Sequence, residues 1–214
     1  FVAQAVTLPL ENWIGEQMEV IDPDAIFHVL RFFRWRLSES LRDELLDVFE
    51  RNFLPGPYLY NAEDAGRRTL KNACLGYLLA PGLEGGVPSE MLAIALTQYS
   101  ESNNMTDRMA ALKSVVNGDR VRGDELLADF YDEWKGDPQV VDKWLSLQAL
   151  CTLPGTLERV RELTGHPAFT IKNPNKVRAL VGTFCSGNMT AFHASDGAGY
   201  RFLGDFVRRL DSMN

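Results

Sequence analysis

Residues 173–200 have the sequence NPNKVRALVGTFCSGNMTAFHASDGAGY, in which a helical pattern runs into a glycine-rich connection. Val177, Leu180, Val181 and Phe184 recur at helical spacing and predict a buried stripe. The dipeptide Asp196-Gly197 is typical of a turn, so the connection has a defined shape. The stretch therefore predicts a helix over 174–186, a turn, and a last helix over 199–213.

Working outward from this stretch, helix starts and stops are frequent and strand-like alternation is nearly absent, which predicts an all-α chain. Asp22-Pro23 is typical of a helix start, and Leu54-Pro55-Gly56-Pro57 of a stop. Between them we expect one long amphipathic helix over 23–52, with one apolar side: Ile26, Val29, Leu30, Phe33, Leu37, Leu41, Leu45 and Phe49. Further helices are expected over 61–80, 89–101, 105–117, 123–135, 138–151 and 155–164.

The later helices pair into hairpins that begin near residues 105, 138 and 173, a spacing of about 34 residues that is common in helical repeat proteins. Short loops favour antiparallel neighbours, and a row of such pairs forms a curved stack with a concave face. We expect a single all-helical domain over 1–214.

Composition narrows the class of protein. The chain has 214 residues, 45% hydrophobic and 24% charged, as in ordinary globular proteins. A net charge of -7 argues against a nucleic-acid partner. No signal peptide or apolar run of about 20 residues is present, so no membrane partner is expected. Cys74, Cys151 and Cys185 lie far apart, which predicts reduced thiols and a cytoplasmic location. Because the chain begins at Phe1 without a Met, we expect a piece of a longer protein.

The tightest basic cluster, Arg31 to Arg36, alternates with Phe32, Phe33 and Trp35. We expect a helix whose aromatic side is buried and whose arginines reach solvent; a binding patch is the alternative.

Two further stretches accompany residues 173–200: AGRRTLKNACLGYL at 65–78 and NNMTD at 103–107. Together and in this order they resemble the C-terminal helical domain of bacterial aminopeptidase N, a zinc-dependent alanyl aminopeptidase family of the gluzincin class. The resemblance implies an armadillo-like or HEAT-like superhelix. It also implies a partner, the catalytic domain of the same polypeptide, as well as zinc and peptide substrates in the parent enzyme.

The chain itself shows no catalytic motif. There is no HExxH, and His28, His166 and His193 are separated by more than a helix each, so no metal ligands are predicted. There is no GxSxG elbow, and the glycines near 197–199 lack the Lys-Ser/Thr pair of a phosphate loop. We therefore predict no catalytic residue, no cofactor in this fragment, and no activity of the fragment alone.

Arg178 is the one candidate for a substrate channel. It lies at the edge of the stripe of Val177 and Leu180, where an arginine must reach a carboxylate or a water-filled cavity because a buried unpaired charge is costly. The alternative is an arginine tied to a helix C-terminus or to an acid such as Asp196. The resemblance places an arginine at this position.

Three other features have simpler interpretations. In NNMTD, Asn104 or Thr106 is expected to cap the next helix, with Asp107 in its first turn. Arg67, Arg68 and Lys71 are expected near the borders of an apolar face, forming ion pairs between repeats, with substrate contact as the alternative. His193 is expected to bond to Asp196 or to a backbone carbonyl.

Two functions remain open from the sequence. The first is a non-catalytic domain that caps the active-site chamber of an alanyl aminopeptidase and controls peptide access. The second is a free-standing helical-repeat scaffold that binds a protein or peptide on its concave face. In the family the domain continues beyond a sequence like that of residues 211–214 into further helices, so we also predict self-association of the truncated fragment.

Overall fold

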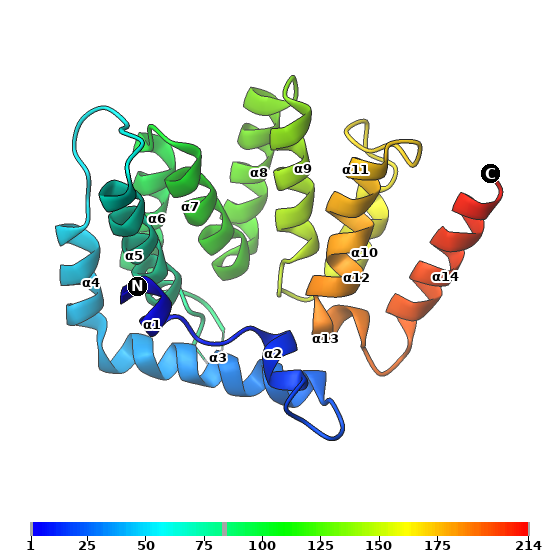
Figure 1. Cartoon of the computed structure of the whole chain (residues 1–214), viewed down its shortest axis with the longest axis horizontal. Helices are drawn as coiled ribbons and strands as arrows, with labels where there is room; N and C mark the ends of the chain where they lie inside the picture. The colour runs from blue at the N-terminus through cyan, green and yellow to red at the C-terminus, as the bar shows by residue number, and fades with distance from the viewer. Residues whose placement is uncertain (1, 83–84, 214) are drawn as a thin grey trace. The chain divides into compact units, whose positions relative to one another are not determined.

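The structure is a computed structural model that describes residues 2–82 and 85–213, and the described chain is all-helical, as predicted. Figure 1 shows the succession of helices along the chain. They are α1 (Val2–Val6), α2 (Glu11–Gly15), α3 (Pro23–Ser40), α4 (Arg42–Arg51), α5 (Ala62–Leu78), α6 (Ser89–Glu101), α7 (Met105–Gly118), α8 (Arg120–Trp134), α9 (Pro138–Ala149), α10 (Thr156–Leu163), α11 (Pro174–Val177), the π-helix η1 (Arg178–Gly182), α12 (Thr183–Gly187), α13 (Met189–Phe192) and α14 (Ala198–Asp211).

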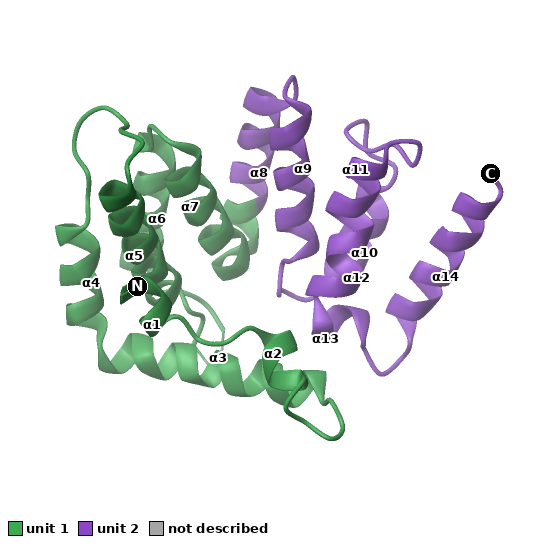
Figure 2. Ribbon diagram, in the orientation of Figure 1, with its two compact units in different colours: residues 1–123 green, residues 124–214 purple. Residues whose placement is uncertain are grey.

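The helices divide into two compact units, residues 1–123 and 124–214, with the division inside α8 (Figure 2). In the first unit, α5 packs against α4 and α7, and α6 packs against α7. Its fully buried side chains include Leu75, Leu78, Leu112 and Val115. The single domain expected over 1–214 stays a prediction.

The second unit centres on α9, which packs against α10, η1 and α12. The largest fully buried side chains of this unit are Phe130, Leu145, Val160, Leu180 and Phe184. Trp144 is also buried, and its indole Nε1 donates a hydrogen bond to the Leu127 carbonyl at 2.9 Å. The polar end of this large ring is therefore satisfied inside the core.

The prediction of a single helix over 23–52 is wrong, because the chain forms two helices, α3 and α4, that are separated at Leu41. The start is as expected: the Asp22 carboxylate accepts from the Ala25 amide at 2.9 Å. At the break, Leu41 has φ -125° and ψ 25°, yet its amide still bonds to the Leu37 carbonyl at 3.0 Å. The chain turns sharply there, and α4 packs along α5 (Figure 1). The contact of α4 with α5 thus compensates for one irregular residue.

The prediction that the aromatic side of α3 is buried is also wrong. Phe32 and Phe33 are 44% and 51% exposed, whereas Ile26 and Leu30 are buried. Arg31, expected in solvent, is half-buried and donates to the Gly82 carbonyl at 2.7 Å. The face that packs is therefore set by Ile26 and Leu30, one helical turn apart, and the phenylalanines fall outside it.

The connection before α14 has the shape expected of it. Gly197 has φ +70°, and the Asp196 carboxylate accepts from the Ala198 amide at 2.8 Å. A Cβ on Gly199 would lie 2.2 Å from the Phe192 carbonyl oxygen, so glycine is required for this close approach. His193 bonds through Nδ1 to the Tyr200 hydroxyl, not to Asp196 or a carbonyl as predicted.

Candidate functional site

A pocket of about 690 Å³ lies within the first unit, between the α4–α5 connection and helices α5, α6 and α7. One side is aromatic and apolar, and the other carries amides and charged groups. The lining residues are Phe49, Phe53, Leu54, Pro55, Gly56, Pro57, Tyr58, Leu59, Asp64, Arg67, Arg68, Lys71, Ala93, Ile94, Thr97, Gln98, Glu101, Ser102, Asn103, Asn104 and Asp107.

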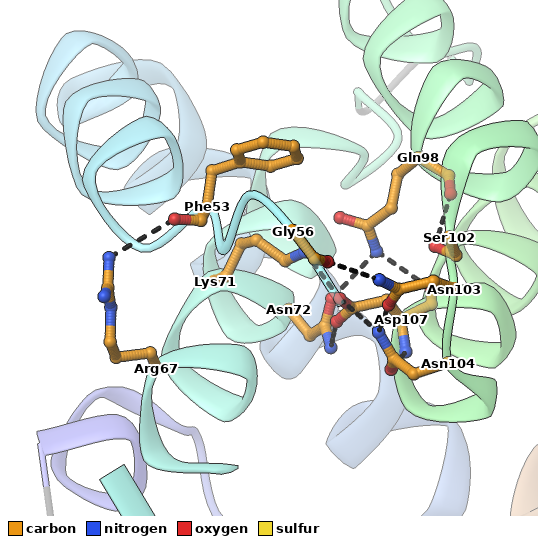
Figure 3. A network of polar contacts seen from close by, with 10 residues as sticks. All are labelled: Phe53, Gly56, Arg67, Lys71, Asn72, Gln98, Ser102, Asn103, Asn104 and Asp107. Carbon is orange, nitrogen blue, oxygen red and sulfur yellow. Dashed lines mark hydrogen bonds and ion pairs between the residues drawn. The ribbon is translucent and has the colours of Figure 1, made fainter. Parts of the chain in front are cut away.

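The wall formed by the α4–α5 connection is tethered through its own carbonyl groups. The Asn103 amide donates to the Gly56 carbonyl at 2.8 Å, and Arg67 Nη2 donates to the Phe53 carbonyl at 3.3 Å (Figure 3). Gly56 has φ +98°, a conformation that favours glycine. These bonds reach the connection from α5 and from the α6–α7 corner, so the wall is held in place without a ligand.

The pocket ends at a buried polar network (Figure 3). Lys71 Nζ and Asp107 Oδ2 form an ion pair at 2.8 Å, with side chains only 4% and 7% exposed. The Asn72 amide donates to Asp107 Oδ1 at 2.8 Å, and the Asn104 amide donates to Oδ2 at 3.1 Å. The carboxylate is therefore bonded on both oxygens, as a buried charge requires.

Gln98 extends the network from α6. Its Nε2 donates to Asn72 Oδ1 and to the Asp107 backbone carbonyl, both at 2.9 Å. Both partners are acceptors, which fixes the orientation of the amide. Gln98 Oε1 is buried and has no hydrogen-bond donor among the described residues, so this network retains one unused acceptor.

Arg68 differs from the other charged groups of the pocket. It is 5% exposed, its Nη2 donates to the Leu59 carbonyl at 3.4 Å, and its guanidinium lies 4.8 Å from the centre of the Tyr58 ring. The structure pairs it with no carboxylate among the described residues. The placement of Arg68 and Lys71 near the borders of a helix face is therefore wrong, because both are buried.

The other expectations for these motifs have mixed outcomes. Asn104 caps α7, as predicted: its Oδ1 accepts from the Asp107 amide at 2.9 Å. Ion pairs between neighbouring repeats were expected here, and Lys71 forms an ion pair with Asp107 on α7. Arg67 bonds instead to the Arg51 carbonyl at 2.8 Å and to the Phe53 carbonyl. Residue types could not predict these two bonds, since nearly every residue offers a backbone carbonyl acceptor.

Arg178, the predicted channel residue, lies in the second unit at the first residue of η1, and its side chain is exposed. The buried charge of this helical segment is Lys176, which bonds to Asp142 at 2.7 Å and to the Pro138 carbonyl at 2.8 Å. The Ser146 hydroxyl of α9 donates a hydrogen bond to the Ala179 carbonyl of η1 at 2.9 Å. Leu180, Val181 and Phe184 are buried, as the predicted stripe requires, but their spacing does not reveal the π-helical turn.

No group of three or more His, Cys, Asp or Glu side chains that could hold a metal ion occurs in the described ranges. The three cysteines are free thiols, as expected. Burial raises the pKa of the Cys185 thiol to about 11, so it is protonated at neutral pH and a poor nucleophile. Among the described helices, none combines the length and the hydrophobicity that a membrane-spanning segment needs.

Comparison with known proteins gives the family. A family model described as a domain of unknown function (DUF3458_C) with ARM repeats matches residues 1–214. The chain belongs to this family. The ARM-repeat description agrees with the predicted armadillo-like helical stack.

Curated relatives named aminopeptidase N match nearly all of the chain. The protein of Escherichia coli strain K12 is 39% identical over 212 residues, which cover 99% of this chain and 24% of the relative. The protein of Haemophilus influenzae is 38% identical over 209 residues, covering 98% of this chain and 23% of the relative. The chain therefore spans about a quarter of the length of these relatives, as the resemblance implied for a domain of a larger polypeptide.

A solved structure supports the same relationship. The crystal structure of Legionella pneumophila aminopeptidase A in complex with aspartic acid matches with a TM-score of 0.87 at 29% identity. The match covers 100% of this chain and 25% of that one. The chain is thus similar in fold to a helical part of an aminopeptidase.

Proposed function

We propose that this chain is the non-catalytic C-terminal domain of a zinc-dependent alanyl aminopeptidase, where it caps the active-site chamber and controls the access of peptides. The supporting observation is that relatives named aminopeptidase N are 36–39% identical across nearly the whole chain while being about four times as long. In this proposal the partners are the catalytic domain of the same polypeptide and its peptide substrates, and the enzyme is cytoplasmic.

The described residues do not fit a zinc site, because they contain no cluster of ligands. Zinc and the hydrolytic residues therefore belong, in this proposal, to another part of the polypeptide. The contribution of this domain is to position peptides and restrict water, which are effects of geometry and not of proton transfer.

Arg178 is the proposed point of contact with peptides. Its guanidinium is exposed, so it can meet a carboxylate of a bound peptide without first breaking an ion pair. A guanidinium binds a carboxylate through two parallel hydrogen bonds, which fixes orientation as well as charge. The π-helical turn that begins at Arg178 is a feature often found at functional positions.

The test uses the full-length polypeptide that contains this chain. Arg178→Ala is expected to raise KM for alanyl tri- and tetrapeptides about tenfold or more, because the charge-assisted hydrogen bonds between the guanidinium and the carboxylate are lost. KM for an alanyl anilide, which has no carboxylate, should stay unchanged. Arg161→Ala, at another exposed arginine of the second unit, is the matched control.

Equal effects of Arg178→Ala and Arg161→Ala would remove Arg178 from the proposal. The absence of an HExxH motif from the complete open reading frame would overturn the peptidase assignment itself and favour the free-standing scaffold.

A further inference from the structure

The pocket of the first unit contains a buried positive charge that the described residues do not balance. Arg68 is 5% exposed, and its one side-chain hydrogen bond to the described residues, from Nη2 to the Leu59 carbonyl, is long at 3.4 Å. The guanidinium also lies 4.8 Å from the centre of the Tyr58 ring. A guanidinium has five N–H donors, so most of them remain for a partner.

The carboxylates that line the pocket do not supply that partner. Asp107 is bonded to Lys71, Asn72 and Asn104. Asp64, one helical turn before Arg68, accepts from the Asn61 amide at 2.9 Å and forms no ion pair with Arg68. The third carboxylate of the lining, Glu101, is exposed at the end of α6.

The remainder of the pocket suits an apolar group. Phe49, Phe53 and Tyr58 line one side together with Pro55 and Pro57. The volume of about 690 Å³ lies within the roughly 300–1,000 Å³ that is usual for sites of small ligands. The bonds that hold the α4–α5 connection through its carbonyls keep this space formed.

We propose that this pocket is a binding site for a small carboxylate with an apolar side chain, namely the α-carboxylate of an amino acid or of a peptide C-terminus. The carboxylate pairs with Arg68, and the apolar side chain lies against Phe49, Phe53 and Tyr58. Ligands of this kind supply the anion that a buried arginine requires. The proposal concerns the first unit, makes no use of Arg178, and does not depend on the peptidase assignment.

The experiment is calorimetric titration of the full-length polypeptide with N-acetyl-L-leucine and with N-acetyl-L-leucinamide. The two probes share their apolar side chain, but only the first has a carboxylate. Acetylation also removes the free amine that an aminopeptidase site requires, so the result is independent of the proposed function. N-acetyl-L-leucine should bind at least about tenfold more tightly than the amide. Equal binding of the two, or no binding, would overturn the proposal.

Competition with L-leucine then distinguishes the two sources of the carboxylate. Stronger displacement by L-leucine than by N-acetyl-L-alanyl-L-leucine indicates a site for free amino acids, and the reverse order indicates a site for peptide C-termini. Failure of both compounds to displace N-acetyl-L-leucine contradicts the proposal.

Variants locate the site. Arg68→Gln should weaken N-acetyl-L-leucine about tenfold or more, while Arg36→Gln should leave binding unchanged, since Arg36 is exposed, paired with Glu39 and outside the pocket. If Arg68→Gln does not fold, crystals of the unaltered protein soaked in N-acetyl-L-leucine decide the question. The ligand carboxylate is expected within hydrogen-bonding distance of Arg68. A ligand elsewhere, or an acidic side chain from the rest of the polypeptide seated on Arg68, would refute the assignment.

Discussion

Lys71 on α5 and Asp107 on α7 form a buried ion pair at 2.8 Å, 36 positions apart in sequence. The pair lies at the centre of the network that also includes Asn72, Gln98 and Asn104 (Figure 3). It connects α5 to the first turn of α7 and closes one side of the pocket.

Removing one partner of this pair should destabilise the protein strongly. Lys71→Met leaves the Asp107 carboxylate buried without its cation, at an expected cost of about 3–5 kcal/mol in the free energy of unfolding. The double variant Lys71→Met/Asp107→Leu should cost less than Lys71→Met alone, because no buried charge is left behind. Urea denaturation of the single and double variants measures both values. A double variant that is less stable than the single one would contradict this account.

Gly199 and Gly204, both on α14, should respond in opposite ways to alanine. A Cβ on Gly199 would lie 2.2 Å from the Phe192 carbonyl oxygen, whereas a Cβ on Gly204 would meet no atom within 4 Å. We therefore expect Gly199→Ala to lower the melting temperature and Gly204→Ala to stabilise by about 0.5–1 kcal/mol through helix propensity. Thermal denaturation followed by circular dichroism tests both, and similar shifts in the two variants would be inconsistent with the packing.

The hydrogen bond from Ser146 to the Ala179 carbonyl connects α9 to the π-helical turn. Ser146→Ala should destabilise by about 1 kcal/mol, the net value of a typical hydrogen bond. Ser186→Ala is the control, because its exposed hydroxyl bonds only to the Gly182 carbonyl of its own helical segment. Chemical denaturation should show a change close to zero for the control, and equal losses would remove the special role of Ser146.

Cys185 should be slow to react with iodoacetamide. Burial raises the pKa of its thiol from 9.0 to about 11, so at pH 8 the thiolate population is roughly 100-fold smaller than in an unfolded chain. Between pH 9 and 11 this thiol ionises in the unfolded chain but not in the folded one. It therefore lowers the free energy of unfolding as the pH rises through that range. Mass spectrometry of native and urea-unfolded protein at pH 8 measures the ratio, and equal labelling rates would contradict it.

Local features of the fold were predictable because their causes are local. The Asp22 and Asn104 caps are confirmed, since a cap needs only a short side-chain acceptor and the next three amides. The break at Leu41 was not predictable. Apolar spacing continues through that residue, and only the contact of α4 with α5 favours a turn there.

The candidate site was predictable only in part. The motifs at 65–78 and 103–107 stood out in the sequence, and they supply Lys71 and Asp107, which meet in the structure. The α4–α5 wall and the π-helical turn at Arg178 were not foreseen. Carbonyl acceptors and a π-helical turn leave no pattern in residue types, so neither could be inferred from helical spacing.

By itself, the sequence determined the all-helical class, the helix starts, the shaped turn at Asp196-Gly197 and the family resemblance, all of which depend on residue types at short spacing. Only the tertiary structure decided which faces are buried, that Lys71 pairs with Asp107, and that Arg68 is buried beside a pocket without forming an ion pair to any carboxylate of the described residues. The physical reason is that burial and charge pairing are properties of helices that meet in space. Residues distant in the chain set the environment of each charge, and the periodicity of one helix cannot predict which residues those are.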